Sequence, residues 1–167
     1  MFPVGEWVVR SAWEQARAWR ENFLQQDFRL GVNISARQFF DASFITLLQS
    51  LSKSCPDLAR LIDLEITEEV ALGKVEEAAD RMRQIRNIGF NISIDDFGSG
   101  YSSISYLHQF PVRKIKIDKS FLDDLGRDDH TAAVIQSMIK LGHNLGVKVV
   151  AEGVETREQV EFLRQHD

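Results

Sequence analysis

Apolar and polar positions follow two periods along the chain, one typical of helices and one typical of strands. Helical spacing, with apolar residues every three to four positions, covers residues 6–20, 43–52, 75–87 and 131–144. Strand spacing, with apolar residues at every second position, covers residues 29–34, 61–67, 91–95, 114–118 and 148–152. The repeated alternation of strand and helix predicts an α/β protein with a parallel sheet covered by helices.

Local signals mark several ends of these helices. Asp41 is a predicted N-cap, since its side chain can accept from the first free backbone amides of a helix. Gly89 and Gly146 are predicted to end helices, because glycine adopts the left-handed conformation that a helix stop requires. Thr156 and Gln159 have the spacing of a capping box and predict a last helix.

The position of the polar residues distinguishes a doubly wound open sheet from a (β/α)8 barrel. Every predicted strand has one apolar face and one polar face, as in Val32 beside Asn33 or Ile94 beside Asp95. Strands buried under helices on both sides should instead be apolar on both faces. A barrel accounts for the pattern: the apolar face packs outward on the helices, and the polar face points into the barrel near its C-terminal end. We therefore expect a TIM-like barrel, of which this chain has about five strands.

Each of the five strands delivers one polar group to the expected active end of that barrel. These groups are Asn33, Glu65, Asp95, Lys116 and Glu152. Several carboxylates at one site repel each other, so a cation has to hold them together. Lys116 offsets one charge, and a divalent metal could offset the rest. The ligands are hard oxygen donors without His or Cys, which favours Mg²⁺ or Mn²⁺ over zinc.

Asp95 and Asp96 are adjacent in sequence, and consecutive strand residues point to opposite faces. Both can reach one site only where the strand ends or bulges, and Gly98 and Gly100 follow closely. Two aspartates at such a point could bridge a pair of metal ions about 3.5–4 Å apart. The alternative, that Asp96 only caps the loop, remains open.

Composition excludes several classes of protein. Apolar residues make up 44% and charged residues 27% of the chain, the net charge is −5, and there is no Lys/Arg-rich block, which argues against a nucleic-acid polymer as partner. No apolar run approaches the about 20 residues of a membrane span. The single Cys55 cannot form an internal disulfide and is in keeping with a reducing cytoplasm.

The polar strand ends also carry a resemblance to a known family. The segments Val32-Asn33-Ile34-Ser35, Leu64-Glu65-Ile66-Thr67-Glu68, Asp95-Asp96-Phe97-Gly98-Ser99-Gly100-Tyr101-Ser102, Lys116-Ile117-Asp118 and Ala151-Glu152-Gly153-Val154-Glu155 resemble, in order and spacing, the motifs of EAL domains. The resemblance implies a barrel that hydrolyses cyclic di-GMP to linear pGpG with two Mg²⁺ or Mn²⁺ ions, in bacterial signalling.

The same resemblance implies roles for individual residues. Metal ligands would be Asn33, Glu65, Asp95, Asp96 and Glu152. Lys116 would orient the attacking water or stabilise charge on the phosphate, so that the catalytic set would be Lys116, Asp95, Asp96 and Glu152. Glu68 would tether the loop Phe97, Gly98, Ser99, Gly100 and Tyr101, which would couple homodimerisation to metal binding. Glu155 would be a supporting acid, or equally an acid at a helix start.

Residues 1–167 are expected to be a single partial domain. The first strands with the Glu-Ala-Leu motif and the last strand would lie outside it, and a closed barrel needs eight strands. The chain alone is therefore expected to be weakly active or inactive. Two other functions remain possible: a non-catalytic cyclic di-GMP receptor, and a Schiff-base aldolase using Lys116. Trp7, Trp13 and Trp19 are predicted to be core residues.

Overall fold

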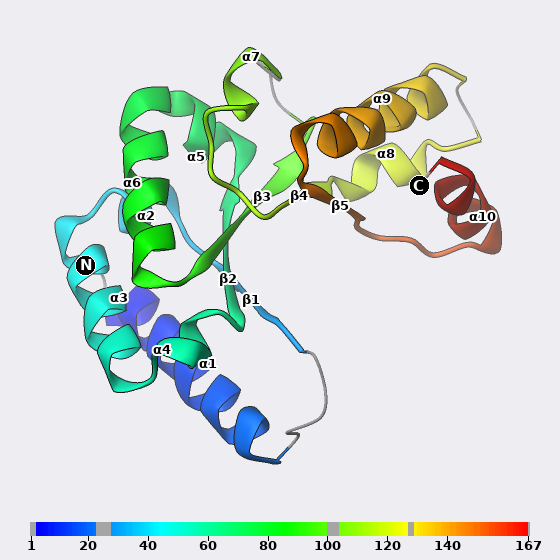
Figure 1. Cartoon of the computed structure of the whole chain (residues 1–167). Coiled ribbons are helices and arrows are strands. Elements are labelled where there is room, and N and C mark those ends of the chain that lie inside the picture. The colour runs from blue at the N-terminus through cyan, green and yellow to red at the C-terminus, as the bar shows by residue number, and fades with distance from the viewer. Residues whose placement is uncertain (1–2, 23–27, 100–103, 127–128, 167) are drawn as a thin grey trace.

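A computed structural model describes residues 3–22, 28–99, 104–126 and 129–166 (Figure 1). Its centre is one sheet of five parallel strands in the order β1-β2-β3-β4-β5, so that each strand pairs with the next along the chain. The strands are β1 (Leu30–Asn33), β2 (Ile62–Thr67), β3 (Asn91–Phe97), β4 (Lys114–Ile117) and β5 (Lys148–Ala151).

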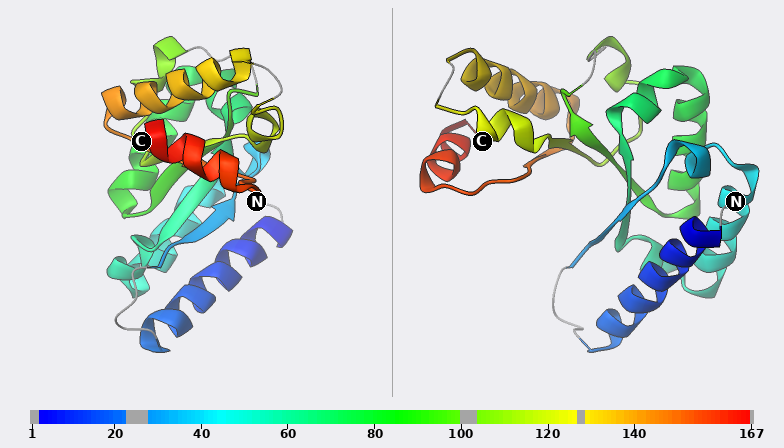
Figure 2. Two further views of the ribbon diagram at one scale, coloured as in Figure 1. Left: turned by 90° about the vertical axis from the view of Figure 1, so that its right-hand side faces the viewer. Right: turned by 180° about the vertical axis from the view of Figure 1, so that it is seen from behind.

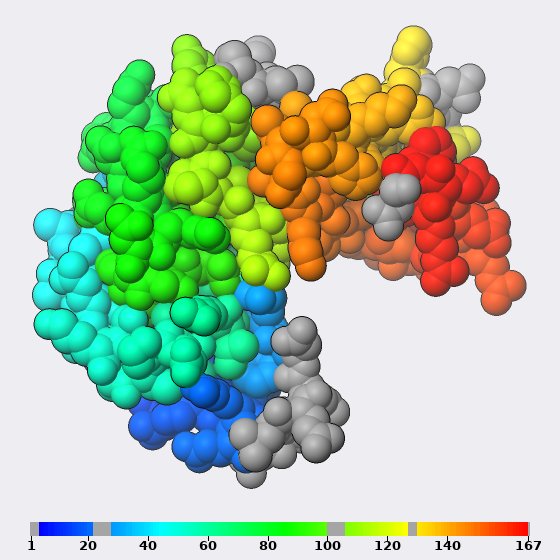
Figure 3. Space-filling model, viewed as in Figure 1, coloured from blue at the N-terminus to red at the C-terminus, as the bar shows by residue number. Residues whose placement is uncertain are grey.

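The sequential strand order supports the barrel over the doubly wound sheet. A doubly wound sheet reverses its strand order at a switch point, whereas a barrel adds strands in one direction. Figure 2 shows the helices following the outside of the strands from both further views. In the space-filling view of Figure 3 the molecule curves around an open side between its first and last segments. The fold is that of an incomplete barrel, as the polar faces of the strands predict.

The described helices are of two kinds. Four long ones lie where helical periodicity predicts a helix: α1 (Pro3–Asn22), α3 (Ala42–Ser54), α6 (Val75–Ile88) and α9 (Asp129–Leu145). The capping box, Thr156 and Gln159, opens a fifth helix of moderate length, α10 (Arg157–His166). Short helices interrupt the loops and are too brief to show a period: α2 (Ala36–Phe39), α4 (Pro56–Ala59), α5 (Glu68–Gly73), α7 (Ile104–Leu107) and α8 (Lys119–Asp123). Among the described helices, none combines the length and apolar character needed to span a bilayer.

The core lies between the outer face of the sheet and the helices. Leu64, Ile92 and Ile115 on neighbouring strands are at most 1% exposed. Buried helix residues such as Phe44 and Met82 join the same apolar cluster. Fully burying side chains of this size contributes about 1.5–3 kcal/mol each, so this face fixes how the sheet is oriented. The opposite face of the strands is left for polar groups.

The predicted helix ends are confirmed. The Asp41 carboxylate accepts from the backbone N–H of Ser43 at 2.8 Å, and Gly89 ends α6 with φ of 115°. Gln159 Oε1 accepts from the N–H of Thr156 at 2.9 Å, and Thr156 Oγ1 accepts from the N–H of Gln159 at 3.2 Å. The cap signals therefore place these ends correctly.

The prediction that all three tryptophans are core residues is wrong for Trp7 and Trp19. Trp13 is 2% exposed, whereas Trp7 is 67% and Trp19 is 38% exposed. Six residues turn an α-helix by about 600°, which leaves neighbouring members of this series about 120° apart around the axis. Only one of the three can face the sheet squarely, and Val9 and Ala16 share the buried face with Trp13.

We expect Gly89→Ala to lower the free energy of unfolding by about 1–2 kcal/mol, because a Cβ is strained at φ of 115°. Urea denaturation of the protein measures this. Gly73→Ala is the matched control, since its φ is not in the left-handed region and a Cβ there meets nothing within 4 Å. Equal destabilisation by both changes would contradict the assignment of Gly89 as a conformational stop.

Candidate active site

Lys116 stands at the centre of a group of carboxylates on the inner face of the sheet. It lies on β4 and is 8% exposed. Its Nζ is 2.9 Å from Glu65 Oε2, 2.9 Å from Asp95 Oδ1 and 2.7 Å from Glu152 Oε1. Side chains from β2, β3, β4 and the end of β5 therefore meet at one ammonium group.

The protonation of Lys116 follows from this surrounding. Burial opposes its charge, but the hydrogen bonds to Glu152, Glu65 and Asp95 outweigh burial and raise the pKa of Lys116 above its ordinary value. The side chain is thus a cation at neutral pH. A Schiff-base lysine needs a lowered pKa to supply a neutral amine, so this site argues against the aldolase.

Asp95 and Asp96 face the same side because β3 is irregular where they lie. The register of β3 with β4 shifts between Ile94 and Phe97, and Asp96 has a φ of 52°. This local turn breaks the alternation that would send Asp96 to the helix side. One oxygen each of Asp95, Asp96 and Glu152 lie within 4.8 Å of one another. The backbone carbonyl of Asp96 accepts from Ser99 Oγ at 2.7 Å, so its backbone holds the loop while its side chain joins the carboxylates.

Mutual repulsion affects the ionisation of Asp96. Burial, and then the charges of Asp95, Asp118 and Glu152, raise the pKa of Asp96 above its ordinary value. Asp118 caps α8 by accepting from the Ser120 N–H at 2.8 Å, and the hydrogen bonds from Ser120 lower the pKa of Asp118.

Asp118 was not predicted as a site residue. The sequence feature that could have identified Asp118 is its position two residues after Lys116. At that spacing, two residues at the end of β4 lie on the same face of the strand.

Asn33 and Glu65 are neighbours across β1 and β2, where they are register partners. The Asn33 side chain is exposed, on the open side of the sheet. A Cβ on Gly31 would lie 2.7 Å from Glu65 Oε1, so the absence of a side chain at Gly31 leaves room for the Glu65 carboxylate.

Glu68 lies at the start of α5, beneath the loop that follows Asp96. It is 4% exposed, and its Oε2 accepts from the Gly98 N–H at 2.7 Å. Phe97 is buried and Ser99 is exposed, while Gly100 and Tyr101 lie outside the described residues.

Glu155 is placed away from the carboxylate group. Its side chain is exposed and pairs with Lys119 Nζ at 2.6 Å, and this hydrogen bond lowers the pKa of Glu155. Its backbone N–H donates to Gln159 Oε1 at 2.7 Å. The geometry therefore matches an acid at a helix start.

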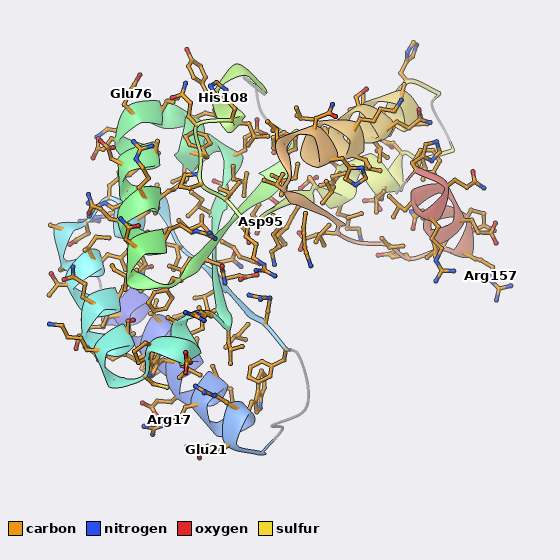
Figure 4. The ribbon with its side chains drawn as sticks, viewed as in Figure 1. Arg17, Glu21, Glu76, Asp95, His108 and Arg157 are labelled. Carbon is orange, nitrogen blue, oxygen red and sulfur yellow. The ribbon has the colours of Figure 1, made fainter. Side chains whose placement is uncertain are left out.

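The donor set fits a hard divalent cation. Asp95, Asp96 and Glu152 offer carboxylate oxygens close together, with Glu65 bound to the same lysine, and the group includes no His or Cys. Figure 4 shows Asp95 near the middle of the sheet, between α6, which carries Glu76, and α10, which carries Arg157. A second cation beside Lys116 would relieve the repulsion between these carboxylates.

Comparison with known families and proteins gives a consistent result. The EAL domain family model matches residues 1–167. The chain is 39% identical over 161 residues to the bifunctional diguanylate cyclase/cyclic di-GMP phosphodiesterase MucR of Pseudomonas aeruginosa, covering 96% of this chain and 23% of that protein. It is 32% identical to the cyclic di-GMP phosphodiesterase PdeR of Escherichia coli, covering 98% of this chain and 24% of that protein.

Solved structures show the same fold. A PaMucR phosphodiesterase in complex with c-di-GMP superposes with a TM-score of 0.91 at 37% identity, over 97% of this chain and 65% of that one. The EAL domain of Mycobacterium smegmatis DcpA superposes with a TM-score of 0.88 at 33% identity, over 98% of this chain and 74% of that one. The chain spans about a fifth of the length of the first curated relatives that it matches.

We expect Asp96→Asn to raise the melting temperature of the metal-free protein at neutral pH. The folded-state pKa of Asp96 is raised, so its ionised form is disfavoured by folding, and the cost applies above the folded pKa. Asparagine also tolerates a φ of 52°. The gain should vanish as pH falls below about 4, where the carboxyl is protonated in both states. Calorimetry in EDTA at several pH values measures it.

Asp80→Asn is the control for this measurement. It removes the same charge from an exposed surface pair with Arg83, where little change in stability is expected. An equal rise in melting temperature for both variants would show that net charge alone is responsible.

Proposed function

The chain belongs to the EAL domain family, and on this basis we propose that the protein is a metal-dependent hydrolase of cyclic di-GMP, with linear pGpG as product, in bacterial signalling. The observation that carries the proposal is the convergence of Glu65, Asp95 and Glu152 on Lys116, with Asp96 beside them. Such a group can hold cations against a phosphodiester. It also explains how an acidic protein could bind an anionic substrate.

Two Mg²⁺ or Mn²⁺ ions are the proposed cofactors. Their proposed ligands are Asn33, Glu65, Asp95, Asp96 and Glu152, all oxygen donors at the carboxyl ends of strands. When bound, such ions lower the pKa of water toward neutrality and neutralise charge on the phosphate. The closeness of the Asp95, Asp96 and Glu152 oxygens supports this assignment.

Lys116 is proposed to act as a fixed cation rather than as a base. Its raised pKa keeps it protonated, so it cannot take a proton from water at neutral pH. It can orient the attacking water and stabilise the negative charge that develops on the phosphate oxygens. As the water oxygen bonds to phosphorus, the water would lose a proton to a neighbouring carboxylate. The P–O bond to the ribose oxygen would break, and that oxygen would leave as a hydroxyl after taking up a proton from the protonated carboxylate or from solvent.

The loop after Asp96 is proposed to couple a homodimer to the metal site. The buried Glu68 holds the start of this loop through the Gly98 N–H. The helix that follows the loop, α7, carries Tyr106, which is 40% exposed. An exposed aromatic side chain beside a tethered loop suits a contact with a second copy. We further propose the cytoplasm as the location, where Cys55 stays reduced.

We expect the full-length protein to hydrolyse cyclic di-GMP with Mg²⁺ or Mn²⁺, and EDTA to abolish turnover. Lys116→Met should lower kcat by about 10²–10³-fold, the effect of losing one preorganised electrostatic group. Glu152→Gln should lower it comparably, because the group loses a charged oxygen. Chromatography of the pGpG product measures turnover.

Glu76→Gln provides the matched control, since Glu76 is exposed on α6 outside the barrel. Its turnover should equal that of the wild type. Metal-independent turnover would contradict the proposal. Binding of cyclic di-GMP without any turnover by the full-length protein would instead establish the receptor function. Residues 1–167 alone should turn over more slowly than the full-length protein, because five strands do not close a barrel.

We expect Tyr106→Glu to increase the monomer fraction of the protein, because it places a charge in the proposed contact. Sedimentation velocity at several concentrations measures this. Tyr106→Phe keeps the aromatic ring and should dimerise like the wild type. The contact is placed wrongly if Tyr106→Glu leaves the dimer unchanged.

A further inference from the structure

A second lysine of β4 lies under the carboxylate group. Lys114 precedes Lys116 by two residues, so both side chains lie on the inner face of the sheet. The Nζ of Lys114 is 3.3 Å from Glu65 Oε1 and 3.2 Å from Asp63 Oδ2. Neither Lys114 nor Asp63 was assigned a role from the sequence.

Asp63 is the buried partner that keeps Lys114 in this place. It is 1% exposed, and Arg29 is its second cation, at 3.6 Å. Neither oxygen of Asp63 has a hydrogen bond of good geometry in the described part of the chain. A buried carboxylate is costly unless a cation compensates it, so Asp63 and Lys114 hold each other.

Strand register explains how Lys114 reaches Glu65 across an intervening strand. Glu65 pairs with Ser93, and Ser93 pairs with Lys114, so the three lie in one row. Ser93 is fully buried, and its small side chain leaves room for the Lys114 side chain to extend toward Glu65. The result is a carboxylate with a lysine at each oxygen: Lys114 at Oε1 and Lys116 at Oε2.

We propose that Lys114, held by Asp63, is a positioning residue that orients the Glu65 carboxylate for metal binding. The inference rests on the proposed function, in which Glu65 is a metal ligand. Lys114 acts through Glu65 and does not itself contact the reacting atoms. Without it, one oxygen of Glu65 loses its partner and the carboxylate can rotate away from the direction that Lys116 and a metal require.

The test measures Mn²⁺ binding to the full-length protein by calorimetry without nucleotide. Lys114→Met should weaken Mn²⁺ binding about tenfold, the lower end of what loss of a group orienting a metal ligand costs. Lys114→Arg keeps charge and donors and should recover most of the affinity. Lys148→Met is the matched control: Lys148 is the register partner of Lys114 on β5, is exposed, and has no ion pair with the described residues. Wild-type affinity in Lys114→Met, or the same loss in Lys148→Met, would overturn the proposal.

A double variant separates positioning from simple structural support. Lys114→Met leaves Asp63 only the longer contact with Arg29, at 3.6 Å, and should lower the melting temperature. Adding Asp63→Asn removes the buried charge and should restore the melting temperature. The Mn²⁺ affinity of the double variant should stay weak, because Glu65 still lacks Lys114. Recovery of affinity together with melting temperature would show that Lys114 only neutralises Asp63, which overturns the proposal.

The same measurements keep the two hypotheses apart. A wild-type protein that binds Mn²⁺ but hydrolyses no cyclic di-GMP removes the proposed function, and the binding series still decides the role of Lys114. A wild-type protein that hydrolyses cyclic di-GMP, with Lys114→Met binding Mn²⁺ normally, removes only the positioning role.

Discussion

Repulsion between carboxylates at the carboxyl ends of neighbouring parallel strands is the constraint on which this site depends. Parallel strands end together, so the groups they carry are brought to one edge by the fold itself. Glu65, Asp95 and Glu152 tolerate this closeness because Lys116 lies within hydrogen-bonding distance of all three. One buried ammonium does not match every charge of the group: burial, and after it the charges of the neighbouring carboxylates, raise the pKa of Asp96.

That arrangement of carboxylates could hold a divalent cation. If protein cations fully neutralised this cluster of carboxylates, the cluster would have little affinity for a divalent ion. The incomplete balance instead leaves oxygens available around Asp95, Asp96 and Glu152. The irregular end of β3 contributes directly, since the positive φ of Asp96 adds a fourth carboxylate to a face where regular pleating would exclude it.

The inner face of the sheet has a layered arrangement of charge beneath that group. Asp63 and Lys114 compensate each other one level below Glu65 and Lys116, so acids and lysines alternate from the core toward the active end. Buried ion pairs add little net stability compared with apolar packing. The outer face of the sheet is apolar. Its buried residues Leu64, Ile92 and Ile115 pack the strands against the helices, which keeps the polar face directed inward.

The sequence by itself determined the α/β class, the strands and long helices, the caps at Asp41 and Gly89, and the face on which each residue of a regular strand lies. These follow from local chemistry and from the periods of helix and strand, which are properties of the chain alone. Only the tertiary structure decided which side chains meet. It showed that three carboxylates share Lys116 and that Asp118 faces Asp96. It also showed that Lys114 extends past Ser93 to Glu65, and that Trp7 is exposed. Such contacts depend on the register between strands, on local irregularities such as the end of β3, and on side-chain rotamers. The register, the irregularities and the rotamers are all set by packing between segments that are distant in sequence. The periodicity of a single segment therefore does not predict them.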